Sequence, residues 1–352
     1  MNDYTFSKSL SALANVKKDF LDRNDELLFN AAKINTLYSN QPKRLACKTC
    51  ESPLSQVVDF RNHGLEYEIC TTCGHLNGLY EDTPLFASSL YKDNGGKNYA
   101  GAYLEDYKER LVTIYAPKVD FLANAMRSVA VGSTWCVEDF GCGAGHFVNA
   151  LSRRQIKARG FDISNQLIRL AEAAWEHDPK LAKKKPPFDV VEDEASLLSK
   201  LKESTAAVIS LVGVLEHLID PLGALSAFCY NKSRFLFISL PLFSMSVFIE
   251  QAFPDVFPRH LSGGHTHLYT HASIGYLCNK YGLKQRAMWH FGCDAMDLRR
   301  SLLVQCKKEG MSDKAQYLLE ETFFNPALMD ALQESIDRSF SASEIHMLLE
   351  KP

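Results

Sequence analysis

The segment Val137–His146 constrains this chain more than any other part of its sequence. It reads Val-Glu-Asp-Phe-Gly-Cys-Gly-Ala-Gly-His, with glycines at positions 141, 143 and 145. The run 131–137 before it predicts a β-strand, and residues 147–151 predict the start of a helix. Glycines in such a turn let the backbone bend sharply and leave room for a ligand to approach the main chain. The segment therefore predicts a strand, a ligand-binding turn and a helix.

The spacing of these glycines limits which ligand the turn can bind. A dinucleotide-binding turn would have its third glycine at position 146, where this chain has His146, and a Walker loop would need Gly-Lys-Ser/Thr. The pattern Asp139-x-Gly141-x-Gly143-x-Gly145 instead resembles motif I of class I S-adenosylmethionine (SAM) methyltransferases. The resemblance implies that this acid and these glycines bind SAM, with the loop around its methionine part. A glycine-rich turn without a ligand is the alternative.

Acidic residues follow the next two predicted strands. Asp162 ends the short strand 159–163, and it lies 21 positions after Gly141, near the offset of a ribose-binding acid. A carboxylate suits that role because it accepts hydrogen bonds from both ribose hydroxyls. As a residue at the sheet rim, we expect Asp162 to support the cofactor and not the core. The strand 188–193 ends in two acids, and the resemblance implies that Asp193 or Glu192 contacts the adenine amino group. The alternative is that they cap the helix beginning near residue 195.

Further strands are predicted at 206–212, 234–240, 284–290 and 344–349, and helical spacings separate most of them. Strands that alternate with helices predict a doubly wound, mostly parallel sheet, and the resemblance implies seven strands in a Rossmann-like fold. Ligands of such sheets bind at the carboxyl ends of the strands. The glycine loop, Asp162, Asp193 and the pair Glu216–His217 all fall there.

Two pairs of cysteines predict a metal site. Cys47-x-x-Cys50 and Cys70-x-x-Cys73 are separated by 19 residues, a spacing that can close a tetrahedral thiolate site around structural Zn²⁺. The chain has ten cysteines and a polar amino terminus without a secretory signal, so we expect a cytoplasmic protein.

The charge of the chain argues against nucleic acid as a partner. Residues 41–75, around the cysteine pairs, carry four basic and four acidic side chains, and the whole chain has a net charge of −3. Nucleic-acid binding leaves a basic patch. The longest apolar stretch, 235–249, is shorter than the roughly 20 residues that span a bilayer, so no membrane span is expected.

A cysteine module followed by a SAM domain resembles bacterial methyltransferases of sugar and surface-polysaccharide biosynthesis, which include deoxysugar C-methyltransferases. The resemblance rests on the cysteine pairs with Gly74 and His75, the glycine loop, the phrase Leu215-Glu-His217, the stretch 291–298, and a pre-loop pattern of Tyr99, Tyr107, Arg110, Pro117 and Lys118. It implies a nucleotide-activated or related sugar as methyl acceptor, and it leaves O- and C-methylation open. A zinc-ribbon RNA or tRNA methyltransferase and a non-catalytic methyltransferase-like scaffold are the alternatives.

Histidines supply the candidate general bases, since a histidine can remove a proton near neutral pH. His217 follows the fourth strand of the SAM domain, and Glu216 beside it is a candidate contact to cofactor or substrate. The segment 258–271 contains four histidines, of which His265 and His267 would share one side of an extended chain. We expect proton transfer or sugar-hydroxyl binding by one of these two, with metal binding as the alternative.

These features divide the chain into five parts. They are a helical segment (1–45), a zinc-binding module (46–80), a helical linker that covers the cofactor (81–129), the SAM-binding domain (130–292), and a helical insertion with a final strand (293–352). In the linker, residues 103–125 predict a helix with a kink at Pro117.

Overall fold

A computed structural model of the chain describes residues 3–10, 23–90, 106–129 and 134–352. Four parts of the predictions lie outside the described residues: Tyr99, the start of the predicted strand at 131–133, the start of the predicted helix at 103–105, and 11–22 of the N-terminal helical segment. None of the helices in the described ranges is both long and apolar enough to cross a membrane.

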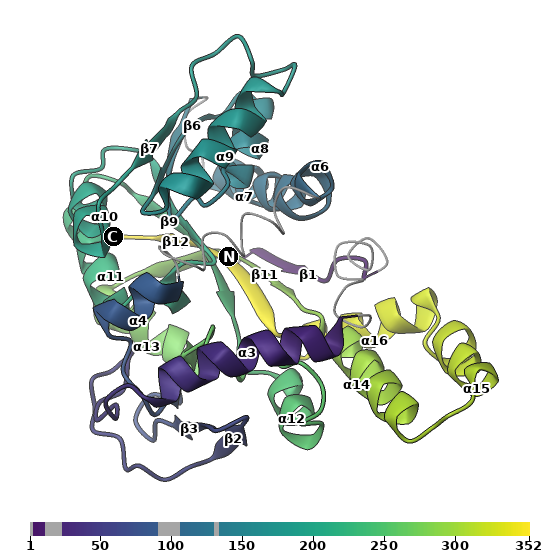
Figure 1. The fold of residues 1–352 in the computed structure, drawn as a ribbon. Helices are drawn as coiled ribbons and strands as arrows, with labels where there is room; N and C mark the ends of the chain where they lie inside the picture. Colours follow the sequence, from purple (N-terminus) through teal and green to yellow (C-terminus); the bar gives the residue numbers. More distant parts are fainter. Residues whose placement is uncertain (1–2, 11–22, 91–105, 130–133) are drawn as a thin grey trace.

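One large sheet dominates the structure, and seven of its strands follow the prediction (Figure 1). All its strand pairs are parallel except those of β12, which is antiparallel to both neighbours. The doubly wound, mostly parallel fold is therefore confirmed. In spatial order the strands are β1 (Asp3–Phe6), β11 (Lys284–Phe291), β12 (Glu344–Glu350), β9 (Phe235–Pro241), β8 (Val208–Val212), β5 (Cys136–Phe140), β6 (Lys157–Asp162) and β7 (Phe188–Val190).

The eighth strand, β1, corrects the helical prediction for the start of the chain. Tyr4 pairs with Met288 of β11, and Ser7 donates a backbone hydrogen bond to His290. The rings of Tyr4 and Phe6 both meet Phe340 edge to face, at 5.8 and 5.6 Å between centroids. Alternating aromatics suit a strand, but the helical spacing of the apolar residues that follow hid this short alternation.

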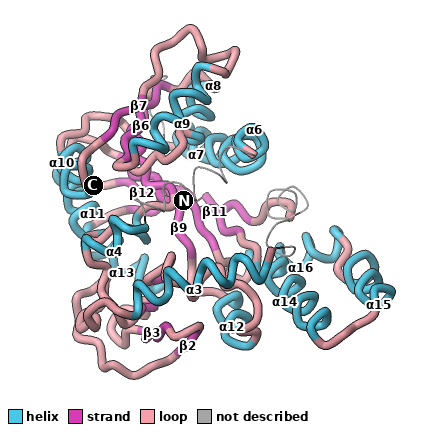
Figure 2. The backbone as a smooth tube through the Cα atoms, viewed as in Figure 1, coloured by secondary structure: helices cyan, strands magenta, loops and turns pink. Residues whose placement is uncertain are grey.

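Helices cover both faces of the large sheet and form two apolar cores (Figures 1 and 2). One face carries α7 (Ala116–Ser128), α8 (His146–Arg153) and α9 (Asn165–Glu176). The other carries α10 (Glu194–Lys202), α11 (Pro221–Tyr230) and α13 (His271–Tyr281). Because each helix packs an apolar side on the sheet, the polar loops are left at the strand ends.

A second, four-stranded sheet lies beside the large one and contains the cysteine pairs in its loops. Its strands, in spatial order, are β10 (His267–Leu268), β4 (Leu76–Gly78), β3 (Leu65–Ile69) and β2 (Phe60–Asn62). Helices α3 (Asn24–Ser39), α4 (Pro84–Ser88) and α12 (Met245–Ala252) pack around it. β10 belongs to the histidine-rich segment, so this sheet is not built from residues 46–80 alone. Periodicity could not reveal a pairing between residues about 190 positions apart.

Seven further helical segments complete the described part of the chain. They are α6 (Tyr107–Arg110), the π-helical turn η2 (Leu111–Tyr115), the short 3₁₀ turn η3 (Leu215–His217), α14 (Asp294–Lys308), α15 (Asp313–Tyr317), the π-helical turn η4 (Leu318–Phe323) and α16 (Pro326–Arg338). The expected irregularity at Pro117 falls one turn earlier, in η2, because proline lacks the N–H that would close the preceding α-helical turn. The helices predicted within 294–340 are present.

Candidate active site and metal centre

A cavity of about 600 Å³ opens at the carboxyl ends of β5, β6, β7 and β8. Five of the predicted site residues line it: Gly141, Gly143, Asp162, Asp193 and His217. Among the residues that line it are also Ser164, Glu192, Glu194 and three residues of α4, namely Pro84, Ala87 and Ser88. The cavity is within the size range of small-molecule and cofactor sites.

The glycine loop uses its glycines for two different purposes. Gly143 has a φ of +52°, and a Cβ added there would meet nothing within 4 Å, so the main chain is open to a ligand. Gly145 has a φ of +74°, but a Cβ there would lie 2.7 Å from the ring of Phe188. The first glycine therefore leaves space for a ligand, whereas the second allows α8 to pack closely on the sheet.

His146, at the position where a dinucleotide loop would have glycine, ties the loop to the helix before it. Its ring stacks on Tyr107 at 3.9 Å and on Tyr115 at 4.9 Å. The Tyr107 hydroxyl donates to the carbonyl of Ala144 at 3.2 Å and accepts from Asn149. Tyr107 and Tyr115, from the helical linker, thus fix the glycine loop through Ala144 and His146.

Asp139 lies beneath the loop and does not line the cavity. It is 2% exposed, and the Ser210 hydroxyl donates to it at 2.7 Å. Burial raises its pKa to about 7, against a smaller opposing effect of the Ser210 hydrogen bond. Asp139 therefore links β5 to β8 through its hydrogen bond with Ser210.

Asp162 is fixed more tightly than a rim residue would be. One carboxylate oxygen accepts from the backbone N–H of Gly143 and the other from that of Ser164, both at 2.8 Å. Burial raises its pKa, and these N–H groups oppose the shift. Our expectation that this residue supports only the cofactor is therefore wrong, because it also holds the glycine loop. Each oxygen retains a lone pair that can accept a further hydrogen bond.

The turn between β7 and α10 contains the acids for which an adenine contact or a helix cap was predicted. Asp193 caps α10 by accepting from the N–H of Ser196 at 2.8 Å, and it also lines the cavity. Glu192 lines the cavity as well. Glu194, which sequence reasoning missed, accepts from the N–H groups of Ile219 and Asp220 at 2.9 and 2.8 Å. It thereby fixes the loop that follows His217.

His217 lies in η3 on the cavity wall, and its ring stacks on His265 with centroids 5.3 Å apart and planes 18° apart. Burial lowers the pKa of His217 to about 3, and that of His265 to about 4. The Nδ1–H of His265 donates to the carbonyl of Arg259 at 2.7 Å, which fixes its ring. Both histidines are therefore neutral at neutral pH.

The other two candidates in this region are further from the cavity. His267 is fully buried in β10, and its Nδ1 lies 2.8 Å from Nε2 of His75. Glu216 is 4% exposed, burial raises its pKa to about 8, and among the described residues its Oε2 has no hydrogen-bond partner. Neither residue lines the cavity. The Cys-Gly-His sequence at 73–75 contains the partner of His267, but the sequence analysis used it only for the family resemblance.

The four predicted metal ligands come together. The ligand atoms of Cys47, Cys50, Cys70 and Cys73 all lie within 4.8 Å of one another, and all four side chains are buried. The Cys47–Cys73 and Cys50–Cys70 sulfur pairs are 3.6 and 3.5 Å apart, and all four are free thiols. Tetrahedral Zn–S bonds place sulfurs about 3.8 Å apart, so the group fits a zinc ion. Within the described part of the chain no histidine belongs to such a cluster.

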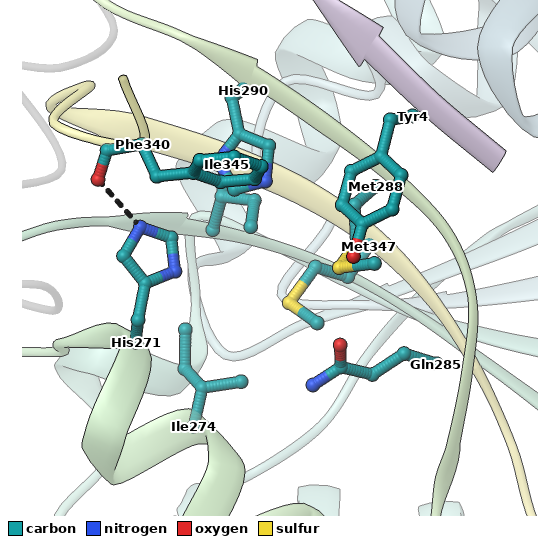
Figure 3. A pocket seen from close by; sticks show the side chains of 9 residues that line it. All are labelled: Tyr4, His271, Ile274, Gln285, Met288, His290, Phe340, Ile345 and Met347. Carbon is teal, nitrogen blue, oxygen red and sulfur yellow. Dashed lines mark hydrogen bonds between the residues drawn. The ribbon is translucent and has the colours of Figure 1, made fainter. Parts of the chain in front are cut away.

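A second cavity, of about 350 Å³, lies between α13 and the β1 edge of the large sheet (Figure 3). His271 donates to the carbonyl of Phe340 at 3.0 Å, and His290 lies beneath the Phe340 ring. Its walls include Met288 and Met347, and among the described residues that line it the histidines are the only ones with an acidic or basic side chain. Burial lowers the pKa of His290 to about 4, so that ring is neutral. This cavity offers no charged partner for a zwitterionic cofactor.

The large sheet has the Rossmann-like arrangement expected of a methyltransferase, with the first cavity at the carboxyl ends of its strands. A family model described as a methyltransferase domain matches residues 105–287, just over half of the chain. The chain therefore belongs to this methyltransferase family and is an enzyme of that class. No curated protein matches the chain.

Solved methyltransferase structures resemble it at low identity. Magnesium protoporphyrin IX methyltransferase from Synechocystis PCC 6803, with bound SAH, is 14% identical, with a TM-score of 0.44 over 58% of this chain and 90% of that one. A putative sarcosine dimethylglycine methyltransferase from Galdieria sulphuraria is 14% identical, with a TM-score of 0.44 over 74% and 98%. The plantazolicin methyltransferase BamL, in complex with SAH and a substrate analogue, is 14% identical, with a TM-score of 0.45 over 75% and 94%.

Proposed function

We propose that this enzyme transfers the methyl group of SAM to a small molecule, and that the acceptor is a nucleotide-activated or related sugar of polysaccharide or natural-product biosynthesis. One observation carries the proposal: the residues suited to the donor and a neutral histidine suited to the acceptor line the same cavity. The sugar class comes from the sequence resemblance. The balanced charge of the cysteine module favours it over RNA.

The donor would occupy the side of the cavity formed by β5, β6 and β7. Asp162 would accept the ribose hydroxyls with its two remaining lone pairs, and Glu192 or Asp193 would accept from the adenine amino group. The open main chain at Gly143 would border the methionine part. Glu216 does not itself line the cavity, but its Oε1 lies beside Gly213 in the wall that follows β8, and from there it would contact the methionine ammonium group.

Methyl transfer is an in-line displacement that needs an aligned acceptor and a base. The acceptor oxygen or carbon forms a bond to the methyl carbon, the sulfur–methyl bond breaks, and its electron pair stays on sulfur to give S-adenosylhomocysteine (SAH). The proton of the acceptor passes to His217, whose ring His265 holds from one side. Burial keeps His217 unprotonated throughout the neutral range, but it also makes the ring a weaker base, so the transfer would depend on the charges that the bound donor and acceptor bring beside it.

The four cysteines would hold a structural Zn²⁺ that stabilises the loops of the small sheet, and the reaction would not involve the ion. We also propose the five-part division of the chain, with β10 added to the zinc module. Thiolate ligands suit the reducing cytoplasm, where we place the enzyme.

Methylation assays with defined acceptors test the proposal. Purified enzyme would be incubated with methyl-labelled SAM and, separately, nucleotide-activated sugars or tRNA, and products read by mass spectrometry. We expect label in a sugar nucleotide. Label in tRNA alone would establish the RNA alternative, and no SAH binding by calorimetry would leave only the scaffold.

The variant His217→Asn tests the base. It should lower kcat by about 10²–10⁴-fold, the usual contribution of a general base, with little change in SAH affinity. His177→Asn, at an exposed position at the end of α9, is the matched control. A His217→Asn enzyme with unchanged kcat would remove this residue from the mechanism.

A further inference from the structure

Helix α4 connects the cysteine module to the cofactor cavity. Thr83 caps the helix by accepting from the N–H of Phe86 at 3.2 Å. On one side of the helix, Phe86 is buried in the core of the small sheet, with its ring 5.2 Å from that of Tyr38. On the other side, Pro84, Ala87 and Ser88 line the cavity. The position of this wall of the cavity thus depends on how α4 is anchored to the module.

Asp82 is the anchor immediately before the helix. Its side chain is 8% exposed and forms ion pairs with two buried cations, Lys48 and Arg44, the second at 2.9 Å. Lys48 stands between the metal ligands Cys47 and Cys50. Burial would raise the pKa of Asp82, but the charges of Arg44 and Lys48 hold it below its ordinary value. The carboxylate is therefore charged and links a cysteine knuckle to the start of α4.

The buried cluster around Asp82 carries a surplus positive charge. Two buried cations face one buried carboxylate, and Glu81, the other acid near Arg44, is 3.7 Å away and 44% exposed. Four thiolates around a divalent metal carry a net charge of −2, so a loaded cysteine site would help to offset this surplus.

Asp82 also reaches the proposed catalytic histidine. The side chain of Thr266, in the histidine-rich segment, lies close enough to Asp82 to help lower the pKa of its carboxyl group. Thr266 immediately follows His265, whose ring stacks on His217. A displaced Asp82 would therefore disturb both the wall of the cofactor cavity and the support of the base.

We propose that Asp82 is a positioning residue that couples the metal centre to the cofactor cavity, so that metal binding and SAM binding strengthen each other. Loaded cysteines hold Lys48, Lys48 holds Asp82, and Asp82 sets α4 against the cavity. The inference rests on the proposed function, because it assumes SAM in this cavity and zinc on the cysteines. Coupling between two sites is reciprocal, so SAH should tighten metal binding by the factor by which metal tightens SAH binding.

Calorimetry with SAH tests the coupling on the full chain, either zinc-loaded or stripped with a chelator. We expect stripping to weaken SAH binding by about tenfold, within the usual range of coupling. In Asp82→Asn that still holds one zinc per chain, SAH binding should be about tenfold weaker and KM for SAM should rise, and kcat should fall as well because the support of His217 is disturbed. Glu81→Gln, the same change of charge at the neighbouring exposed acid, should match the wild type.

A double-mutant cycle identifies the route. Because Lys48→Met and Asp82→Asn break the same link, their effects on SAH affinity should not add. If Asp82→Asn fails to fold, Lys48→Met alone decides by the same measurements. Zinc-loaded wild type that binds no SAH would refute the proposed function. Wild type that binds SAH equally with and without zinc, or a zinc-loaded Asp82→Asn with unchanged affinity, would overturn the coupling alone.

Discussion

Replacing Asp162 with alanine should affect both the cofactor and the fold, and the two effects can be estimated separately. The carboxylate accepts the N–H groups of Gly143 and Ser164. Leaving a buried donor without an acceptor costs about 1–3 kcal/mol, so the loss of both acceptors should lower the free energy of unfolding by about 2–6 kcal/mol. This is a substantial part of the stability of an ordinary domain.

The cofactor effect of the same variant should be larger than the loss of one contact. Hydrogen bonds to a charged group contribute about 1.5–3 kcal/mol each, and Asp162 would make two with the ribose hydroxyls. The SAH dissociation constant should therefore rise at least 100-fold, since each 1.4 kcal/mol is a factor of ten. The glycine loop, released at Gly143, would add to the loss.

Calorimetry with SAH and thermal unfolding would measure the two effects of Asp162→Ala on the same preparation. Asp189→Asn is the control, because this acid lies in the neighbouring strand β7 but is 42% exposed and pairs with Arg159. It should change neither quantity appreciably. A folded Asp162→Ala protein whose SAH affinity stays within threefold of the wild type would refute the placement of ribose at this residue.

Two further predictions concern the base and the metal. Because burial lowers the pKa of His217 to about 3 from an ordinary 6.5, kcat should not titrate near pH 6.5, and an apparent pKa there in the pH–rate profile would contradict the assignment. The same shift means that the folded protein takes up a proton at His217 less readily than the unfolded chain does. The contribution of His217 to the free energy of unfolding should therefore be full above pH 6.5 and should diminish as the pH falls from about 6.5 towards 3. Urea unfolding at several pH values would measure this loss. Cys50→Ser should reduce the bound zinc, measured by mass spectrometry, and should lower the unfolding temperature of the cysteine module. The control Cys306→Ser, in α14, should retain full zinc. A Cys50→Ser protein with one zinc per chain would exclude Cys50 as a ligand.

The sequence was most informative where function depends on strand ends. Asp162, Asp193 and His217 each follow a predicted strand, and in a doubly wound sheet those ends meet, so local patterns were enough to bring them to one cavity. The cysteine pairs were equally local. Contacts between distant segments could not be predicted from local patterns. Nothing in the sequence near position 82 indicates that α4 lines the cavity, because this depends on how distant segments pack together.

The two histidines of the 258–271 segment show the same limit. An extended chain would place His265 and His267 on one side, but the strand begins only at His267. His265 lies in the irregular stretch before it and meets His217, whereas His267 pairs with His75. Side chains two positions apart lie on the same side only where the backbone is a strand, and His265 lies just before the strand begins.

The strand β10 has a consequence for exchanging parts between enzymes of this family. His267 pairs with Asn77 in the small sheet, and two residues later Tyr269 bridges to Leu242 beside the large sheet. A graft of residues 46–80 alone would therefore leave the edge of β4 without its partner, and an exposed edge invites association with other chains. A working chimera has to carry the 258–271 segment with its module, so these two stretches form one transplantable unit although most of the cofactor domain separates them in the sequence.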